Sequence, residues 1–159
     1  GIKELGAERV FLTSTTHGAE MCGLGALVET IKFYKDHKVI DHLWNYGKKL
    51  VSEMNTIAKE LQISDYFVAT GVECSPNYVT KDTNKEVSLA FRTLFSQEMI
   101  KNGVLMPWIA ISYAHTDKEL NKTLEAVRKS LQVYIKALNE GVDKYLVGAS
   151  IKPVFRKYN

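Results

Sequence analysis

The sequence is poor in residue types on which special folds and sites depend. It contains only two cysteines and three prolines among 159 residues. Cys22 and Cys74 lie far apart and lack the CxxC spacing of a metal knuckle or a redox motif. So few cysteines argue against a disulfide framework and suit a reducing compartment. We therefore expect a cytoplasmic protein.

Long apolar runs and a strong charge bias are also missing. No apolar stretch approaches the roughly 20 residues that a membrane span requires, and no signal peptide is visible. The formal net charge is only +3, and the lysines are scattered among acidic residues. A nucleic-acid-binding protein more often concentrates its basic residues in a stripe. Neither a membrane nor a nucleic acid is an expected partner.

The sequence does have the composition and length of one ordinary globular domain. It is 45% hydrophobic and 25% charged, and a chain of this length can bury a core without disulfides or metals. It begins GIKELGAERVFLT, without an initiator methionine. We therefore expect a fragment of a longer protein, in which residues needed for chemistry lie elsewhere.

Apolar residues recur at the three- and four-residue spacing of amphipathic helices. The spacing predicts helices at about 19–37, 40–61, 87–102 and 117–138. Thr116 and Glu119 have the pattern of a capping box at the start of the last helix, and Gly141 ends it. Gly23 and Gly25 are poor helix formers, which suggests that the first helix packs closely against a neighbour.

Segments rich in aromatic and β-branched residues predict short strands between the helices. They are residues 66–70, 73–80, 104–106 and 109–113. Pro76 marks the second as an edge or interrupted strand, because proline cannot donate a ladder hydrogen bond. The order of the elements predicts an α+β fold, with helices packed on a small sheet.

A hydroxyl-rich run, TSTTHG at residues 13–18, precedes the first expected helix. Hydroxyls at such a position commonly cap the helix. They also suit an anion, because backbone N–H groups at a helix start and neighbouring hydroxyls together make a phosphate site. The residue types alone leave both interpretations open and favour capping, since hydroxyls precede most helices.

Other side chains with chemical potential favour structural roles. His115 immediately precedes a helix cap, and Cys74 has no histidine or lysine pattern beside it, so an inert buried thiol is expected. Arg92 and Arg156 could grip a carboxylate, but a single arginine on a helix or tail is usually a surface residue. The aspartates show no metal-ligand spacing. No catalytic residue and no metal ligand is assigned.

Two longer stretches are more specific. TSTTHGAEMCGLGALVETIKFYKDHKVIDHLWNYGKKL, residues 13–50, resembles the region that follows the catalytic lysine in class III pyridoxal-phosphate (PLP) aminotransferases. The resemblance is strongest to the glutamate-1-semialdehyde 2,1-aminomutase-like group. NGVLMPWIAISYAHTDKELNKTLEAVRKSL, residues 102–131, is similar to the closing segment of the same family. With the order of the elements, the resemblance extends to about Leu138.

The resemblance implies the C-terminal part of a PLP-dependent transferase of fold type I. Residues 1–37 would be the end of the large domain, with a phosphate-binding turn and a connecting helix. Residues 38–140 would be the C-terminal small domain, a small antiparallel sheet with helices packed on it, and residues 141–159 a tail. The implied partners are a small-molecule amino substrate and a second subunit, in a homodimer that binds the cofactor phosphate across its interface.

The resemblance also implies a role for the hydroxyl run. The family threonine that matches Thr15 bonds the phosphate of pyridoxal 5'-phosphate in the neighbouring subunit's site. Thr15 is therefore the expected cofactor-binding residue, with Ser14 and Thr16 close by. The family's Asn-Pro is Ala19-Glu20 in this sequence, a departure that bears on the shape of the turn.

The implied activity is amino-group transfer through a Schiff base with the cofactor. The family's Schiff-base lysine lies upstream of the matched region, and no lysine here matches it, so this chain alone is expected to be inactive. The stretch PWIAISYAHT lacks the carboxylate-binding arginine of many class III enzymes, as does the aminomutase group. Two alternatives stay open: an aminotransferase acting on a sugar or other amine substrate, and a non-catalytic association module.

Overall fold

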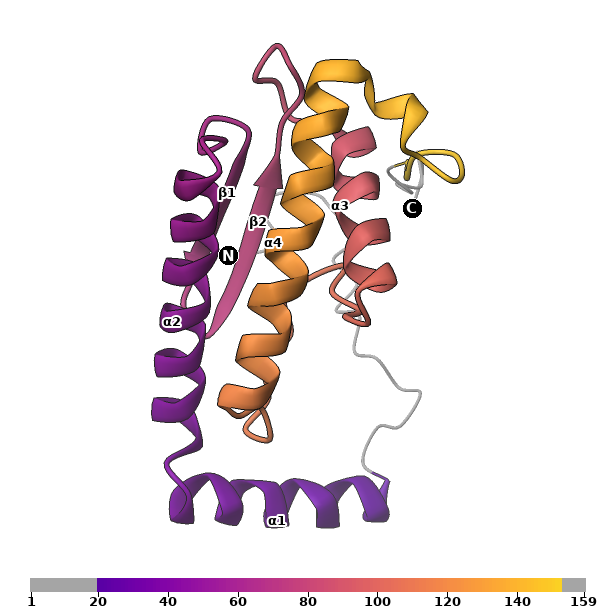
Figure 1. Ribbon diagram of the computed structural model, residues 1–159. Coiled ribbons are helices and arrows are strands. Elements are labelled where there is room, and N and C mark those ends of the chain that lie inside the picture. The colour runs from indigo at the N-terminus through magenta and orange to yellow at the C-terminus, as the bar shows by residue number, and fades with distance from the viewer. Residues whose placement is uncertain (1–19, 153–159) are drawn as a thin grey trace, which may run out of the picture. The chain divides into compact units, whose positions relative to one another are not determined.

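The computed structural model describes residues 20–152. Figure 1 shows helices α1 (Met21–Asp36), α2 (Val39–Glu60), α3 (Leu89–Lys101) and α4 (Asp117–Glu140), strands β1 (Phe67–Val72) and β2 (Ser75–Thr80), and a short 3-10 helix, η2 (Val142–Lys144). The chain divides into two compact units, Gly1–Val39 and Ile40–Asn159. Helix α1 belongs to the first unit, and the sheet and the other helices belong to the second. The predicted α+β class is confirmed.

Helix α1 is apolar in sequence but buries none of its residues. Its large apolar side chains, all exposed, are Met21, Leu24, Leu27, Val28, Ile31, Phe33 and Tyr34. The close packing expected from Gly23 and Gly25 is not found within residues 20–152, because a Cβ atom at either position would meet no described atom within 4 Å. The helical spacing alone was therefore a sound guide to α1, and the close packing at the glycines stays a prediction.

Strands β1 and β2 form a two-stranded antiparallel sheet, with a register that runs from Phe67 opposite Thr80 to Val72 opposite Ser75. Pro76 lies opposite Gly71. Gly71 has a φ of 102°, a conformation that glycine adopts at little energetic cost. Both strands of such a pair are edges, so proline is tolerated in β2. The first two predicted strands are confirmed.

A side chain from α2 closes the outer edge of β1. The amide nitrogen of Asn55 donates to the carbonyl of Ala69 at 2.9 Å, and the N–H of Ala69 donates to the Asn55 side-chain oxygen at 2.8 Å. Asn55 therefore satisfies both backbone groups of a buried strand residue, as a third strand would.

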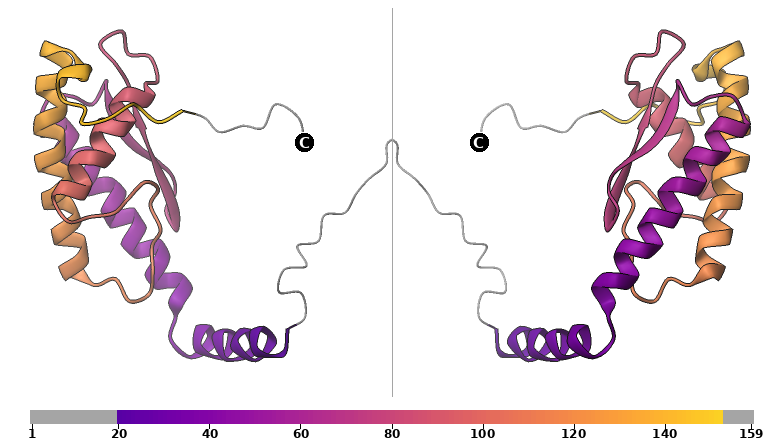
Figure 2. Two further views of the ribbon diagram at one scale, coloured as in Figure 1. Left: turned by 90° about the vertical axis from the view of Figure 1, so that its right-hand side faces the viewer. Right: turned by 90° about the vertical axis from the view of Figure 1, so that its left-hand side faces the viewer.

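The core of the second unit lies between the sheet and helices α2, α3 and α4 (Figure 2). Aromatic rings join the layers: the Phe95 ring centroid of α3 is 4.9 Å from those of both Phe67 and Tyr78. Helices α2 and α4 add Met54 and Leu131, which are fully buried. These contacts bury the apolar faces that the helical spacing predicts.

The predicted start of α4 is confirmed in detail. The Thr116 side chain accepts a hydrogen bond from the N–H of Lys118 at 3.2 Å, and the Glu119 carboxylate accepts from the N–H of Thr116 at 2.9 Å. This reciprocal pair is a capping box. At the other end Gly141 has a φ of 94°, which ends the helix.

The two strands predicted at 104–106 and 109–113 are wrong. Residues 104–116 form an irregular loop between α3 and α4. Part of its backbone is satisfied by side chains rather than by a neighbouring strand: the Tyr78 hydroxyl donates to the carbonyl of Met106 at 3.1 Å, and Arg92 donates to the carbonyl of Pro107 at 3.1 Å. Met106 and Ile109 of this loop are buried in the core without pairing to a strand.

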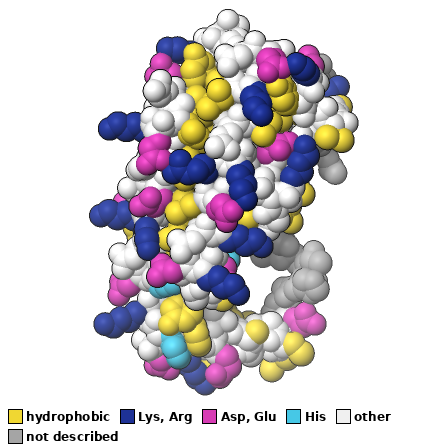
Figure 3. Space-filling model, viewed as in Figure 1, with side chains coloured by type: hydrophobic (Ala, Val, Ile, Leu, Met, Phe, Trp, Pro, Cys, Tyr) yellow, Lys and Arg dark blue, Asp and Glu magenta, His cyan; other side chains and the backbone are white. Residues whose placement is uncertain are grey.

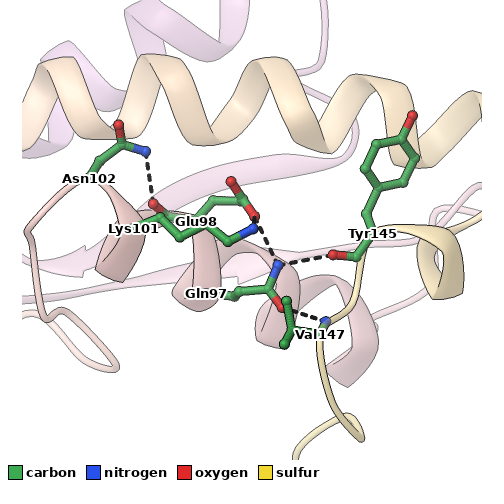
Figure 4. A network of polar contacts seen from close by, with 6 residues as sticks. All are labelled: Gln97, Glu98, Lys101, Asn102, Tyr145 and Val147. Atoms are coloured by element: carbon green, nitrogen blue, oxygen red, sulfur yellow. Dashed lines mark hydrogen bonds and ion pairs between the residues drawn. The ribbon is translucent and has the colours of Figure 1, made fainter.

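The chain beyond α4 is fastened to α3. The Gln97 side chain donates to the carbonyl of Tyr145 at 2.9 Å and accepts from the N–H of Val147 at 2.8 Å (Figure 4). The N–H of Ile151 donates to the Thr93 hydroxyl at 2.9 Å. Residues 145–151 therefore follow the exposed side of α3.

Candidate functional site

The three residues expected to bind the cofactor, Ser14, Thr15 and Thr16, lie outside the described residues. The structure nevertheless bears on the capping alternative, because α1 begins at Met21 and its N-cap residue is Glu20, which makes no side-chain capping bond. None of the three hydroxyl residues is thus the N-cap residue of α1. A phosphate remains the ligand that this donor set would suit.

A groove of about 410 Å³ lies in the second unit, where the α3–α4 loop passes between α2 and the start of α4. It is lined by Tyr46, Leu50, the loop residues 103–111, and His115, Glu119, Lys122 and Thr123. The segment 104–116 belongs to the stretch that resembles the closing segment of class III aminotransferases. Most of the residues that line the groove therefore belong to the second matched motif.

Side chains from β2 and α3 hold the loop that forms the groove. The Tyr78 hydroxyl, on a side chain only 1% exposed, bonds the carbonyl of Met106. The Arg92 guanidinium lies 4.4 Å from the Tyr78 ring centroid and bonds the carbonyls of Tyr78 and Pro107. Arg92 is half-buried and its guanidinium is hydrogen-bonded to backbone carbonyls. It therefore holds the loop in place and does not bind a carboxylate ligand.

The loop alternates buried and exposed apolar side chains. Met106 and Ile109 are each 6% exposed and belong to the core. Leu105 and Trp108 are 80% and 68% exposed. The groove therefore has an apolar floor and two large apolar side chains on its rim that are still in contact with water.

Gly47 sets how closely α2 approaches the β1–β2 turn and this loop. A Cβ atom there would lie 1.7 Å from the backbone oxygen of Glu73 and 2.7 Å from the Cδ1 atom of Ile111. Only glycine fits without displacing backbone. Sequence analysis missed this residue, although a glycine in the middle of an otherwise regular helical pattern was a usable signal.

His115 and Tyr46 contribute polar side chains to the lining of the groove. The N–H of Ser112 donates to His115 Nδ1 at 3.2 Å, so a neutral His115 carries its proton on Nε2. The ring centroids of His115 and Tyr46 are 5.7 Å apart. The expected structural role of His115 at the cap is supported, and the ring also faces the groove.

Glu119, the acidic residue of the lining, is hydrogen-bonded within the capping box of α4. Hydrogen bonds from the Thr116 hydroxyl and then the Thr116 N–H lower the pKa of Glu119 to about 2. Partial burial, followed by the charges of Glu119 and Asp117, raises the pKa of Tyr46. At neutral pH Glu119 is therefore an anion engaged by Thr116, and Tyr46 is a protonated donor.

A second hollow shares Tyr46 and His115 with the groove and is also lined by His42, Asn45, Lys49 and Tyr113. The His42 and Tyr113 ring centroids are 5.1 Å apart in an edge-on arrangement. His42 Nε2 is buried and has no hydrogen-bond partner among the described residues. The hollow is thus an aromatic cluster around an unsatisfied nitrogen.

Other candidates do not gather into a site. Among residues 20–152, no group of three or more histidine, cysteine, aspartate or glutamate side chains could hold a metal ion. Both cysteines are free, and Cys74 is half-buried, not fully buried as expected. Figure 3 shows basic and acidic side chains interspersed on one face of the molecule. None of the described helices is both long and apolar enough to cross a membrane.

Comparisons with known proteins agree with the resemblance at a coarse level. No protein-family profile matches the chain. The chain is 30% identical over 128 residues to 3-aminobutyryl-CoA aminotransferase of Cloacimonas acidaminovorans (strain Evry). That match covers 79% of this chain but only 30% of the relative.

In fold the chain is similar to the FumI protein of Sphingopyxis sp. MTA144, solved in its PLP internal aldimine form. The TM-score is 0.58 at 19% sequence identity, over 71% of this chain and 27% of that protein. The chain thus spans less than a third of the length of either protein. Neither match supports the aminomutase-like group in particular. The chain is therefore similar in sequence to an aminotransferase and in fold to one part of a PLP-containing protein.

Proposed function

We propose that the chain is the C-terminal part of a PLP-dependent class III aminotransferase. The observation that carries the proposal is the 30% identity to an aminotransferase across 79% of the chain. The fold similarity to part of a PLP-containing protein supports the choice of cofactor. In such an enzyme the bound cofactor acts as an electron sink during amino-group transfer.

Within that enzyme, residues 1–37 would close the large domain, residues 38–140 would form the small domain, and residues 141–159 the tail. Thr15, with Ser14 and Thr16, would bond the cofactor phosphate of the partner subunit in a homodimer. Hydroxyl and N–H donors suit a dianionic phosphate. The small domain would form one wall of the substrate pocket and hold the substrate in position. We place the enzyme in the cytoplasm.

No lysine of this chain matches the family's Schiff-base lysine, so we propose that the 159 residues alone have no transaminase activity. The chain's own contribution is to bind the phosphate, to shape the substrate pocket and to join subunits. A non-catalytic association module is the rival from another class. A lysine about 30 residues upstream of Thr15 in the parent sequence, as in the family, would exclude that rival.

Two substrate classes are in competition. The sequence resemblance favours an aminomutase of the glutamate-1-semialdehyde type, because residues 107–116 lack the arginine that many class III enzymes use for a carboxylate. The named activity of the relative favours instead an intermolecular aminotransferase acting on an amino acyl thioester. Substrate profiling of the intact protein separates these classes from each other and from a sugar or other amine.

The test of the cofactor assignment is Thr15→Ala in the full-length protein. Because the hydroxyl would bond a charged phosphate, its loss should raise the PLP dissociation constant about tenfold or more. PLP titration followed by absorbance measures the change. Thr30→Ala is the matched control, since among residues 20–152 the Thr30 hydroxyl bonds the Ala26 carbonyl of its own helix, at 2.8 Å. An unchanged dissociation constant in the Thr15 variant would refute the assignment.

A further inference from the structure

We propose that the groove between α2 and the α3–α4 loop binds the pantetheine-like arm of an acyl thioester, a chain that alternates apolar carbon with carbonyl oxygens. The inference rests on the second substrate class above, the amino acyl thioester. It gives the arm of that substrate a place in this chain and names the side chains that would recognise it.

The apolar part of the groove suits an extended chain. Leu105 and Trp108 leave most of their surface in water, whereas Met106 and Ile109 beneath them are buried. A ligand that covers the two exposed side chains removes apolar surface from water on both partners. The volume of about 410 Å³ lies within the range of about 300–1,000 Å³ that small-molecule sites occupy.

The polar part suits a ligand rich in acceptors. Tyr46, His115 and Lys122 are among the residues that line the groove, and their side chains carry three donor groups: the Tyr46 hydroxyl, the His115 Nε2–H and the Lys122 ammonium. These three groups make no hydrogen bond or ion pair with other residues in the range 20–152 that the structure places. The carboxylate in the lining, that of Glu119, is engaged by Thr116. The amide and thioester carbonyls of a pantetheine arm are acceptors, which is what three open donors require.

The charge of the lining favours the arm over the nucleotide end of coenzyme A. Lys122 is the lone lysine or arginine among the described residues that line the groove. Binding a bisphosphorylated nucleotide usually takes several cations or a row of backbone N–H groups. A short amino acid, in turn, would leave Leu105 and Trp108 uncovered. An arm with repeated carbonyls uses both the donors and the apolar rim.

Trp108 allows the proposal to be tested directly by fluorescence. The chain has two tryptophans, and Trp44 is not among the groove residues, so Trp44→Phe leaves Trp108 as the reporter. Titration of this variant of the 159-residue chain with S-butyryl pantetheine should change Trp108 emission saturably. Adenosine 3',5'-bisphosphate and butyrate should leave the emission unchanged, because each lacks the arm.

Two variants with the same chemical change test the site. Leu105→Glu should weaken S-butyryl pantetheine binding about tenfold or more, because it places a carboxylate beside the carbonyls and removes apolar surface. Val147→Glu is the control, since Val147 is 81% exposed but lies outside the groove. Both positions are exposed, so both variants should fold, which circular dichroism checks.

Tyr46→Phe, which removes one donor, should weaken binding by a smaller factor.

Three outcomes would overturn the proposal: no saturable response to S-butyryl pantetheine, an equal response to adenosine 3',5'-bisphosphate, or equal weakening by Val147→Glu. The assay needs no PLP, so it separates this proposal from the proposed function. A full-length protein that binds PLP through Thr15 while S-butyryl pantetheine leaves Trp108 unaffected would keep the aminotransferase assignment and lose the arm site.

Discussion

Helices α1 and α4 have the same kind of apolar spacing in sequence but different surroundings in the structure. Helix α4 buries one face, with Leu120, Ala126, Val127, Ser130, Leu131, Tyr134 and Ala137 inside the second unit. Helix α1 buries none of its residues. Apolar spacing therefore predicts that a helix forms and which of its faces is apolar, but not what covers that face. Their first turns differ as well, because α4 has a complete capping box and α1 has no side-chain cap.

A pair of phenylalanines should show the largest difference. Phe95→Ala removes a fully buried ring that contacts Phe67 and Tyr78, and should lower the free energy of unfolding by about 3–5 kcal/mol. Phe33→Ala on α1, where the ring is 42% exposed, should cost less than about 1 kcal/mol. Chemical denaturation of the 159-residue chain measures both. Equal losses would show that the apolar face of α1 is covered in solution.

A pair of glycines should give effects of opposite sign. Gly47→Ala brings a Cβ atom against the Glu73 backbone and should destabilise the chain by about 1–3 kcal/mol. Gly25→Ala on α1 meets open space and should stabilise that helix by up to about 1 kcal/mol, because alanine has the higher helix propensity. Thermal unfolding followed by circular dichroism reports both. A neutral Gly47→Ala would contradict the close approach of α2 to the β1–β2 turn.

The helix starts should show the smallest difference. Thr116→Ala breaks the capping box and should cost about 1 kcal/mol in the free energy of unfolding at neutral pH. Glu20→Ala, at the N-cap position of α1, should cost at most about half of that, since Glu20 makes no side-chain capping bond. Urea denaturation of both variants beside the parent chain is sufficient. A larger loss from Glu20→Ala would reverse the comparison.

The pH dependence of unfolding provides a second test of the capping box at Thr116. The pKa of Glu119 is about 2 in the folded chain against an ordinary value of 4.5, so its contribution to stability is fully present above pH 4.5 and is lost as the pH falls through about 2. Glu119→Gln should remove this part of the acid sensitivity. In the Thr116→Ala background the same substitution should change the profile less, because the hydrogen bond from the Thr116 hydroxyl, the largest cause of the lowered pKa, is gone while the backbone N–H of residue 116 still donates.

Local patterns were reliable where a local cause operates. The four helices, the first two strands, the capping box at Thr116 and the stop at Gly141 follow from the spacing of apolar residues and from single residues at helix ends. The strands expected at 104–106 and 109–113 failed because aromatic and branched residues mark burial as well as pairing. Whether a partner strand lies alongside depends on residues far away in the sequence. Here Tyr78 and Arg92 donate hydrogen bonds to the backbone of the loop instead.

The groove was outside the reach of sequence analysis for the same reason. Its lining comes from α2, from the α3–α4 loop and from α4, and Gly47 lets α2 lie close to Ile111 of the loop. In the sequence, the position of His115 beside a cap favoured a structural role over a catalytic one. The family resemblance drew attention to residues 102–131 as the second motif, but it said nothing of the groove that Tyr46, His115 and Lys122 line.

By itself, the sequence determined the approximate extents of the helices, the α+β class and the similarity to an aminotransferase, because hydrogen bonds within a helix, capping and residue identity are properties of neighbouring residues. Only the tertiary structure decided which apolar faces are covered, how Asn55 closes the edge of β1, and how Tyr46, His115 and Lys122 come to line one groove. Those contacts join residues that are far apart in the chain. They form only when the whole core packs at close density, and packing depends on shapes that no short stretch of sequence contains.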